Sequence, residues 1–246
     1  MVKAEKQIVF DVVGTLVSYD HFFEAIESRL GEKLRAECIK PKLLGFAWME
    51  AAEREYTYMS ISGKYTVFFD VFGPLFYRML WMAGVQEPRK FATDEDRDYI
   101  LAAYRQLKMR PGAAECVQKL RAAGFTVWAF TAGDIARVGA YFKSGGIEMP
   151  AENLLSCDTL GVGKPASEAY RPLLEQFGVE KSGGIGHSVW FGAAHMWDVS
   201  AAKRTGFRGA YCSIWENEPC VELFGKMDVM APTLPEMADQ VIAASQ

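Results

Sequence analysis

Beyond residue 110 the sequence alternates regularly between strand and helix patterns. Short apolar, β-branched runs are followed by stretches in which apolar residues recur every three or four positions. This alternation builds a parallel sheet with helices on both faces, that is, a Rossmann-like α/β fold. The expected strands are 125–130, 153–157, 188–191 and 209–212, and the expected helices are 113–123, 135–143, 168–177, 198–205 and 235–244.

One further strand pattern, Gln7–Val13, precedes this alternation and is separated from it by a long segment of different character. Aromatic residues and methionines recur there at helical spacings, and we expect helices and no strand. An all-helical block between the first strand and the others is an insertion. We therefore expect a core formed by residues 1–17 and 106–246, and a helical cap formed by residues 18–105.

Composition excludes several classes of protein. The 246-residue chain has a formal net charge of −4 and no basic stripe, which argues against nucleic acid as a partner. The five cysteines are scattered without a C-x-x-C pair, which favours free thiols in a reducing compartment. The first apolar run is too short for a signal peptide, and no stretch is suited to crossing a membrane. We expect a cytoplasmic protein without a membrane partner.

Several polar residues lie at, or just after, the ends of the expected strands or of the segments that connect them. Asp11 closes the first strand pattern, and the glycine and threonine after it permit a tight turn. Ligands bind at the carboxyl ends of the strands in such sheets, so Thr131, Lys164 and Asp198 can converge with Asp11. Asp11 is either a nucleophile that forms an ester or a cap of the following loop, and the other three residues favour the nucleophile.

These residues belong to motifs that resemble those of the haloacid dehalogenase superfamily. The segment Asp11–Leu16 (D-x-x-G-T-L) is similar to the first motif, and Thr131 to the second. Lys164, followed by proline, is similar to the third motif. Trp190-Phe191-Gly192, followed by a Trp-Asp pair, is similar to the fourth. The order and spacing of the motifs fit over nearly the whole chain.

Two features look most like the L-2-haloacid dehalogenase (type II) branch of this superfamily. They are the Trp197-Asp198 pair and the Glu55-Tyr56-Thr57 run in the expected cap. The resemblance implies a Rossmann-like core with a helical cap, hydrolase activity on a small molecule without a cofactor, and dimerisation through the cap.

The resemblance also implies roles for four catalytic residues. Asp11 is the nucleophile, and Thr131 supplies a hydroxyl group. Lys164 would hold Asp11 ionised and offset negative charge that develops on the intermediate. Asp198 would orient Lys164 or activate the water that cleaves the ester, and it is also a candidate helix N-cap.

Two departures separate the chain from the phosphatases of the superfamily. Those enzymes carry a second acid two residues after the nucleophile, which protonates an alkoxide leaving group, and Val13 stands there instead. No second carboxylate follows Asp198 within the next turn to help hold Mg²⁺, so we expect no metal. A halide leaves without a proton, and a site without that acid suits dehalogenation.

Other departures concern substrate binding. Glu50 stands where the dehalogenases have a cap arginine for the halide, and Arg54, one turn further on, is a candidate substitute. Ala132 replaces an asparagine of the second motif. His195 replaces an asparagine of the fourth, and it is either structural or an acid or base near neutral pH. The expected substrate contacts are Val13, Glu50, Arg54, Ala132, His195 and Trp197.

Three functions follow from these observations. We expect a metal-independent hydrolase that resembles a 2-haloacid dehalogenase and works through an ester of Asp11. The alternative is a repurposed family member that binds a larger apolar metabolite, or converts it by acid–base chemistry of His195 and Glu50. Phosphatase activity is a weaker alternative.

Overall fold

The computed structural model describes residues 6–178 and 189–246. The chain divides into two compact units. The α/β unit comprises Met1–Ser18 and Met109–Gln246, and the helical unit comprises Tyr19–Lys108. That the helical unit acts as a cap stays a prediction.

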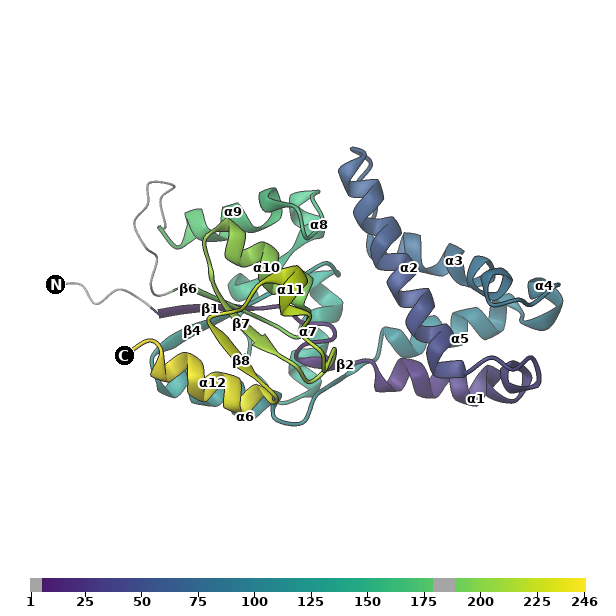
Figure 1. Ribbon diagram of the computed structural model, residues 1–246, viewed down its shortest axis with the longest axis horizontal. Helices are drawn as coiled ribbons and strands as arrows, with labels where there is room; N and C mark the ends of the chain where they lie inside the picture. The colour runs from purple at the N-terminus through teal and green to yellow at the C-terminus, as the bar shows by residue number, and fades with distance from the viewer. Residues whose placement is uncertain (1–5, 179–188) are drawn as a thin grey trace. The chain divides into compact units, whose positions relative to one another are not determined.

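The α/β unit is built on a six-stranded parallel sheet with the order β5-β4-β1-β6-β7-β8 (Figure 1). The strands are β1 (Lys6–Phe10), β4 (Phe125–Thr131), β5 (Leu154–Ser156), β6 (Val189–Ala193), β7 (Arg208–Cys212) and β8 (Val229–Ala231). The central strands β1 and β6 are almost wholly buried, as strands covered on both faces must be: β6 is a continuous apolar run, and β1 is apolar from Ile8 to Phe10. The sheet confirms the predicted fold class.

Helices cover both faces of this sheet. The helices α6 (Ala113–Ala122) and α12 (Leu234–Ala243) pack together on one face, and α9 (Ser167–Gln176) and α10 (Met196–Thr205) on the other (Figure 1). Helices α6, α9 and α12 each bury an apolar stripe and expose polar residues on the opposite side, whereas α10 also buries the polar residues Asp198 and Ser200. The remaining helices of the unit are α7 (Ile135–Ser144), α8 (Cys157–Leu160), α11 (Val221–Phe224) and a 3₁₀ turn (Ala151–Asn153).

The helical unit consists of five helices between residues 19 and 104, without a strand, as predicted. They are α1 (Asp20–Ala36), α2 (Pro41–Ile61), α3 (Phe68–Met82), α4 (Pro88–Phe91) and α5 (Asp94–Tyr104). Their core is aromatic: the rings of Trp48 and Phe72 lie 4.4 Å apart, and those of Phe22 and Tyr104 lie 5.4 Å apart. A separate two-stranded sheet is formed by β2 (Val17–Ser18) and β3 (Lys108–Met109).

Two predicted elements differ from the structure in ways that bear on the site, and one strand of the sheet was not predicted. The strand predicted over Gln7–Val13 ends at Phe10, because the chain turns back and the Val12 carbonyl accepts hydrogen bonds from two later amides of the turn. The helix predicted over 198–205 begins at Met196, so His195 and not Asp198 is its N-cap residue. Strand β8 was not predicted, since three residues are too few to show a period.

Candidate active site

Asp11 lies directly after β1, at the carboxyl edge of the sheet. Strand β1 pairs with β4 on one side and with β6 on the other, and Phe10 lies opposite Ala129 and Gly192. The Asp11 amide continues the pairing by donating to the Gly192 carbonyl at 3.0 Å. The chain adds β4 and β5 on one side of β1 and β6 to β8 on the other. Ligands bind at such reversals of strand order, so Asp11 occupies the expected place for chemistry.

Among the residues that the structure describes, three side chains contact the Asp11 carboxylate. The Lys164 ammonium donates to Oδ1 at 2.9 Å, and the Thr15 hydroxyl donates to Oδ2 at 2.7 Å. The His195 Nδ1 atom lies 3.3 Å from Oδ2. Thr15 is itself held in place, because its hydroxyl oxygen accepts a hydrogen bond of 2.8 Å from the Ala194 amide. Both carboxylate oxygens are therefore positioned by groups from separate parts of the α/β unit.

These contacts keep Asp11 in its charged form. Burial by itself would raise the pKa of this carboxyl group, since charge is costly in a low dielectric. The Lys164 ammonium and the contact with His195 outweigh burial, and the pKa of Asp11 lies well below its ordinary value. Asp11 is only 7% exposed, so few water molecules shield it from an incoming electrophile.

Lys164 lies between two carboxylates. Its ammonium group contacts Asp11 and donates to Asp198 Oδ2 at 2.7 Å. Burial favours the neutral amine, but the two carboxylates outweigh it and raise the pKa of Lys164 above its ordinary value. The lysine therefore stays protonated and supplies a fixed positive charge beside Asp11.

Asp198 is fully buried in the first turn of α10, and both of its oxygens are occupied. Oδ2 accepts from Lys164, and Oδ1 accepts from the Tyr170 hydroxyl at 2.5 Å. Burial and the nearby charge of Asp11 raise the pKa of Asp198 despite the lysine. A carboxylate so enclosed orients Lys164, and this arrangement favours the orienting role over activation of water.

Thr131 ends strand β4, which pairs with β1, the strand that Asp11 directly follows. Its side chain is buried, and its hydroxyl oxygen accepts a hydrogen bond of 3.0 Å from the Gly133 amide. This bond shapes the loop that leads into α7. Ala132 is half-buried in the same loop.

The other predicted contacts in the α/β unit lie on two neighbouring loops. His195 is buried between β6 and α10, and the Trp197 ring packs against its imidazole with 5.8 Å between the ring centroids. Val13 is half-buried in the turn after Asp11, where it forms an isolated bridge with Val17.

The two predicted cap residues belong to helix α2 of the helical unit. Both Glu50 and Arg54 are exposed on that helix. The Arg54 guanidinium donates to Glu55 Oε1 at 3.3 Å. Their participation in substrate binding stays a prediction.

The chain matches a family model over most of its length. The family model of haloacid dehalogenase-like hydrolases matches residues 5–206, which contain every residue of the site. The chain belongs to this family. Its members are hydrolases, and the predicted enzyme class is confirmed.

Relatives and solved structures point to one branch of the family. The chain is 27% identical to (S)-2-haloacid dehalogenase 4A from Burkholderia cepacia over 61% of its own length and 64% of that protein. A solved L-2-haloacid dehalogenase has a TM-score of 0.81 at 18% identity, with 97% of this chain and 99% of that chain covered. A second solved structure is the L-2-haloacid dehalogenase from Xanthobacter autotrophicus with chloropropionic acid covalently bound. It has a TM-score of 0.68 at 20% identity, with 96% of this chain and 98% of that chain covered. The predicted resemblance is confirmed, and at these identities the solved structures establish the fold.

Two residues of this candidate site were not among the predicted site residues. Thr15 is part of the first motif, but the sequence indicated only that it binds the turn. Tyr170 lies on the buried stripe of α9, between Ala169 and Leu173. A phenol on an apolar helix face needs a polar partner, and this feature of the sequence could have identified Tyr170.

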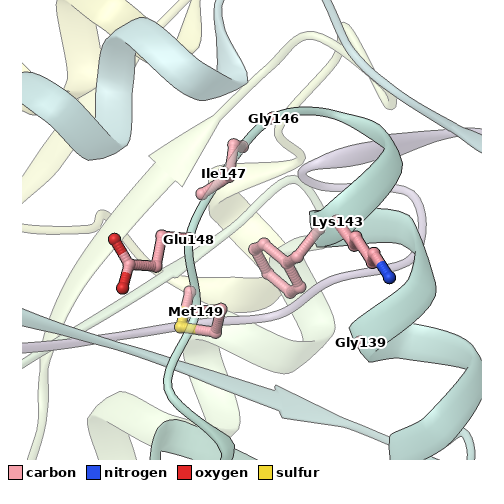
Figure 2. Close-up of a pocket in the computed structure, with 7 residues that line it drawn as sticks. Gly139, Lys143, Gly146, Ile147, Glu148 and Met149 are labelled. Atoms are coloured by element: carbon pink, nitrogen blue, oxygen red, sulfur yellow. The ribbon is translucent and has the colours of Figure 1, made fainter.

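A surface pocket lies apart from these residues, at the end of α7. Phe142, Lys143, Ile147 and Glu148 contribute to its lining (Figure 2). It contains none of the predicted site residues. Within residues 6–178 and 189–246, no group of three or more His, Cys, Asp or Glu side chains is placed to hold a metal ion. Among the helices of the same residues, none has both the length and the apolar character needed to span a bilayer.

Proposed function

We propose that this hydrolase cleaves the carbon–halogen bond of small 2-haloacids through a covalent ester of Asp11, without a metal ion. The observation that carries the proposal is the ionised, nearly buried Asp11 carboxylate held against Lys164. The names of the relatives supply the substrate class, and one solved relative has chloropropionic acid covalently bound.

In the first step an oxygen of Asp11 attacks the carbon that carries the halogen. A carbon–oxygen bond forms, the carbon–halogen bond breaks, and the halide leaves with the electron pair. No proton is needed, which agrees with Val13 in place of an acid two residues after the nucleophile. Lys164 and Thr15 hold the carboxylate at a fixed angle, so little reorganisation precedes the attack.

In the second step water attacks the carboxyl carbon of the ester. The product leaves as a 2-hydroxy acid, and the Asp11 carboxylate is restored with one oxygen atom from water. Negative charge develops on the carbonyl oxygen during this attack, and the Lys164 ammonium is placed to stabilise it.

Further roles follow from the same proposal. Thr131, Ala132, Val13 and Trp197 line the approach to the nucleophile, and Glu50 or Arg54 contacts the substrate from the helical unit. We also expect a cytoplasmic homodimer. The cysteines among the described residues are free, which agrees with a reducing compartment.

The test is halide release from a panel of 2-chloro and 2-bromo acids by the wild-type chain and by Asp11→Asn. We expect the variant to lose activity by about 10⁴-fold or more, about 5 kcal/mol in the barrier, because an amide is a poor nucleophile. It should fold normally, since Lys164 keeps its contact with Asp198. Unchanged turnover in Asp11→Asn would contradict the covalent mechanism.

A second candidate is supported by the contact between His195 and Asp11. An imidazole oriented by a carboxylate can remove a proton from a water molecule that attacks the substrate directly. His195 with Glu50 would then act on a larger apolar metabolite by acid–base chemistry, without an ester. A single turnover in water enriched in heavy oxygen distinguishes the two routes. The ester route transfers an Asp11 oxygen to the first product molecule, whereas direct attack by water places a heavy oxygen in it.

A further inference from the structure

We propose that His195 is the general base that activates the water for hydrolysis of the Asp11 ester. This inference rests on the proposed function. It assigns hydrolysis of the ester to a residue that formation of the ester does not need.

The position of His195 carries the argument. The residue joins β6 to α10, and its imidazole is 7% exposed, with Nδ1 3.3 Å from Asp11 Oδ2. The ring is held on one side by Trp197. The carbon that water must attack is bonded to that same Oδ2 atom. A water molecule bound to the imidazole would therefore lie beside the ester carbonyl, within the reach that a general base requires.

The other titratable groups around the carboxylate are unsuited to this role. Lys164 is protonated, because its pKa is raised by two carboxylates, and an ammonium cannot accept a proton. Asp198 is 0% exposed, and its two oxygens accept from Lys164 and Tyr170. Glu216 faces the start of α10 from the loop after β7, where it accepts from the Met196 amide at 2.9 Å.

Charge couples the two steps. Before the reaction, the negative charge of Asp11 favours the protonated imidazolium of His195. Formation of the ester removes that charge, while the positive charge of Lys164 remains. The neutral imidazole is then favoured, so the base becomes available at the stage that needs it.

The proton balance of the step is complete. His195 takes one proton from water while the oxygen of that water bonds to the carboxyl carbon of Asp11. The bond between this carbon and the oxygen that carries the substrate then breaks, and the departing 2-hydroxy acid takes that proton from His195. The second proton of the water remains on the regenerated Asp11 carboxyl group and passes to His195, which restores both the carboxylate and the imidazolium. The proton that His195 gave to solvent when the ester formed is the one proton released in each turnover. No oxidant or further reactant is required.

The experiment is rapid-mixing kinetics of His195→Gln with (S)-2-bromopropionate and bromoacetate, followed by intact-mass analysis of the protein. We expect one halide per active site to be released rapidly, followed by turnover at least 100-fold slower than in the wild type. The mass of the ester adduct should accumulate. His21→Gln is the matched control, because His21 is a half-exposed histidine of α1 in the other unit, and it should behave as the wild type.

A structural role for His195 is separated by rescue. His195→Gly with added imidazole should regain steady-state turnover and lose the adduct, whereas added imidazole should leave Asp11→Asn inactive. His195→Asn provides a second variant if the glutamine variant does not fold.

The outcomes separate the two proposals. An adduct in the wild type that does not accumulate in His195→Gln would overturn the role of His195 alone. If His195→Gln lost both the rapid halide phase and steady-state turnover, the role of His195 as the base for ester hydrolysis would also be overturned. His195 would then act before the ester forms. Turnover by the wild type and by His195→Gln without any adduct would overturn the ester, and with it this inference.

Discussion

The two units of the molecule are stabilised by different kinds of contact. In the α/β unit, charged and hydroxyl side chains are buried at the carboxyl edge of the sheet and satisfy one another, as Lys164 does with Asp11 and Asp198. In the helical unit the interior is aromatic. Leaving tyrosine and tryptophan aside, Asp96 is the one residue of the helical unit among the buried polar or charged side chains of the described chain.

The difference teaches how each unit should respond to substitution. A buried charge network contributes little net stability as a whole, but loss of one member leaves its partners buried and unpaired. An aromatic core is sensitive to volume, because a void removes transfer free energy and dispersion contacts together. Changes of charge should therefore matter most in the α/β unit, and changes of volume should matter most in the helical unit.

The largest effect is expected for Lys164→Met, which keeps the length of the side chain and removes the charge. The Asp11 and Asp198 carboxylates lose their shared cation, and we expect a loss of about 3–5 kcal/mol in the free energy of unfolding at pH 7. Halide release should fall below detection. Urea unfolding measures the first effect, and adding Asp198→Asn should recover part of the loss. If Lys164→Met were as stable as the wild type, the α/β unit would not be sensitive to the loss of a buried charge, and the contrast between the two units would be contradicted.

The next effect tests the aromatic core. Phe72 is fully buried and contacts Trp48, Phe22 and Tyr104. Phe72→Ala should destabilise the helical unit by about 3–5 kcal/mol, because a large cavity forms. Trp81→Ala on the same helix is the matched control, since Trp81 is 57% exposed. Thermal unfolding followed by circular dichroism checks both, and equal losses in the two variants would contradict the assignment of the core.

The smallest effect concerns Asp96, the polar exception in the helical unit. Its carboxylate accepts from the Thr93 amide at 2.8 Å and from Arg29 Nε at 2.6 Å. Burial opposes ionisation, but these bonds outweigh it and lower the pKa of Asp96. Asp96→Asn should cost about 1–2 kcal/mol at pH 7, through the weakened cap of α5.

The pH dependence gives that prediction its sign. Because the folded pKa of Asp96 lies below the unfolded value, the stabilisation is complete above the unfolded pKa of about 3.8. It is lost as the pH falls from there through the folded pKa. Urea unfolding at several pH values should show the difference between wild type and Asp96→Asn shrinking in acid. The exposed Asp98→Asn serves as control, and a difference that grows in acid would contradict the pKa direction.

The sequence predicted the fold well, for identifiable reasons. Continuous apolar runs such as Val189–Ala193 and helices with one apolar face have periods that can be read without a structure. The predicted strand over Gln7–Val13 ran too far, because Val12 and Val13 have strong strand propensity while hydrogen bonds within the turn fix their conformation. Propensity is local, and the turn is decided by contacts between residues along it.

The sequence by itself determined the α/β class, because periodicity is carried by the chain, and its motif order predicted the helical insertion and the candidate residues Asp11, Thr131, Lys164 and Asp198. Only the tertiary structure decided which of these residues contact one another. It enclosed Asp198 between Lys164 and Tyr170 and brought His195 to within 3.3 Å of Asp11. The physical reason is that burial, charge pairing and access to water depend on which segments meet at the sheet edge. Such contacts join residues as distant in the sequence as Asp11 and His195, and no local sequence pattern encodes them.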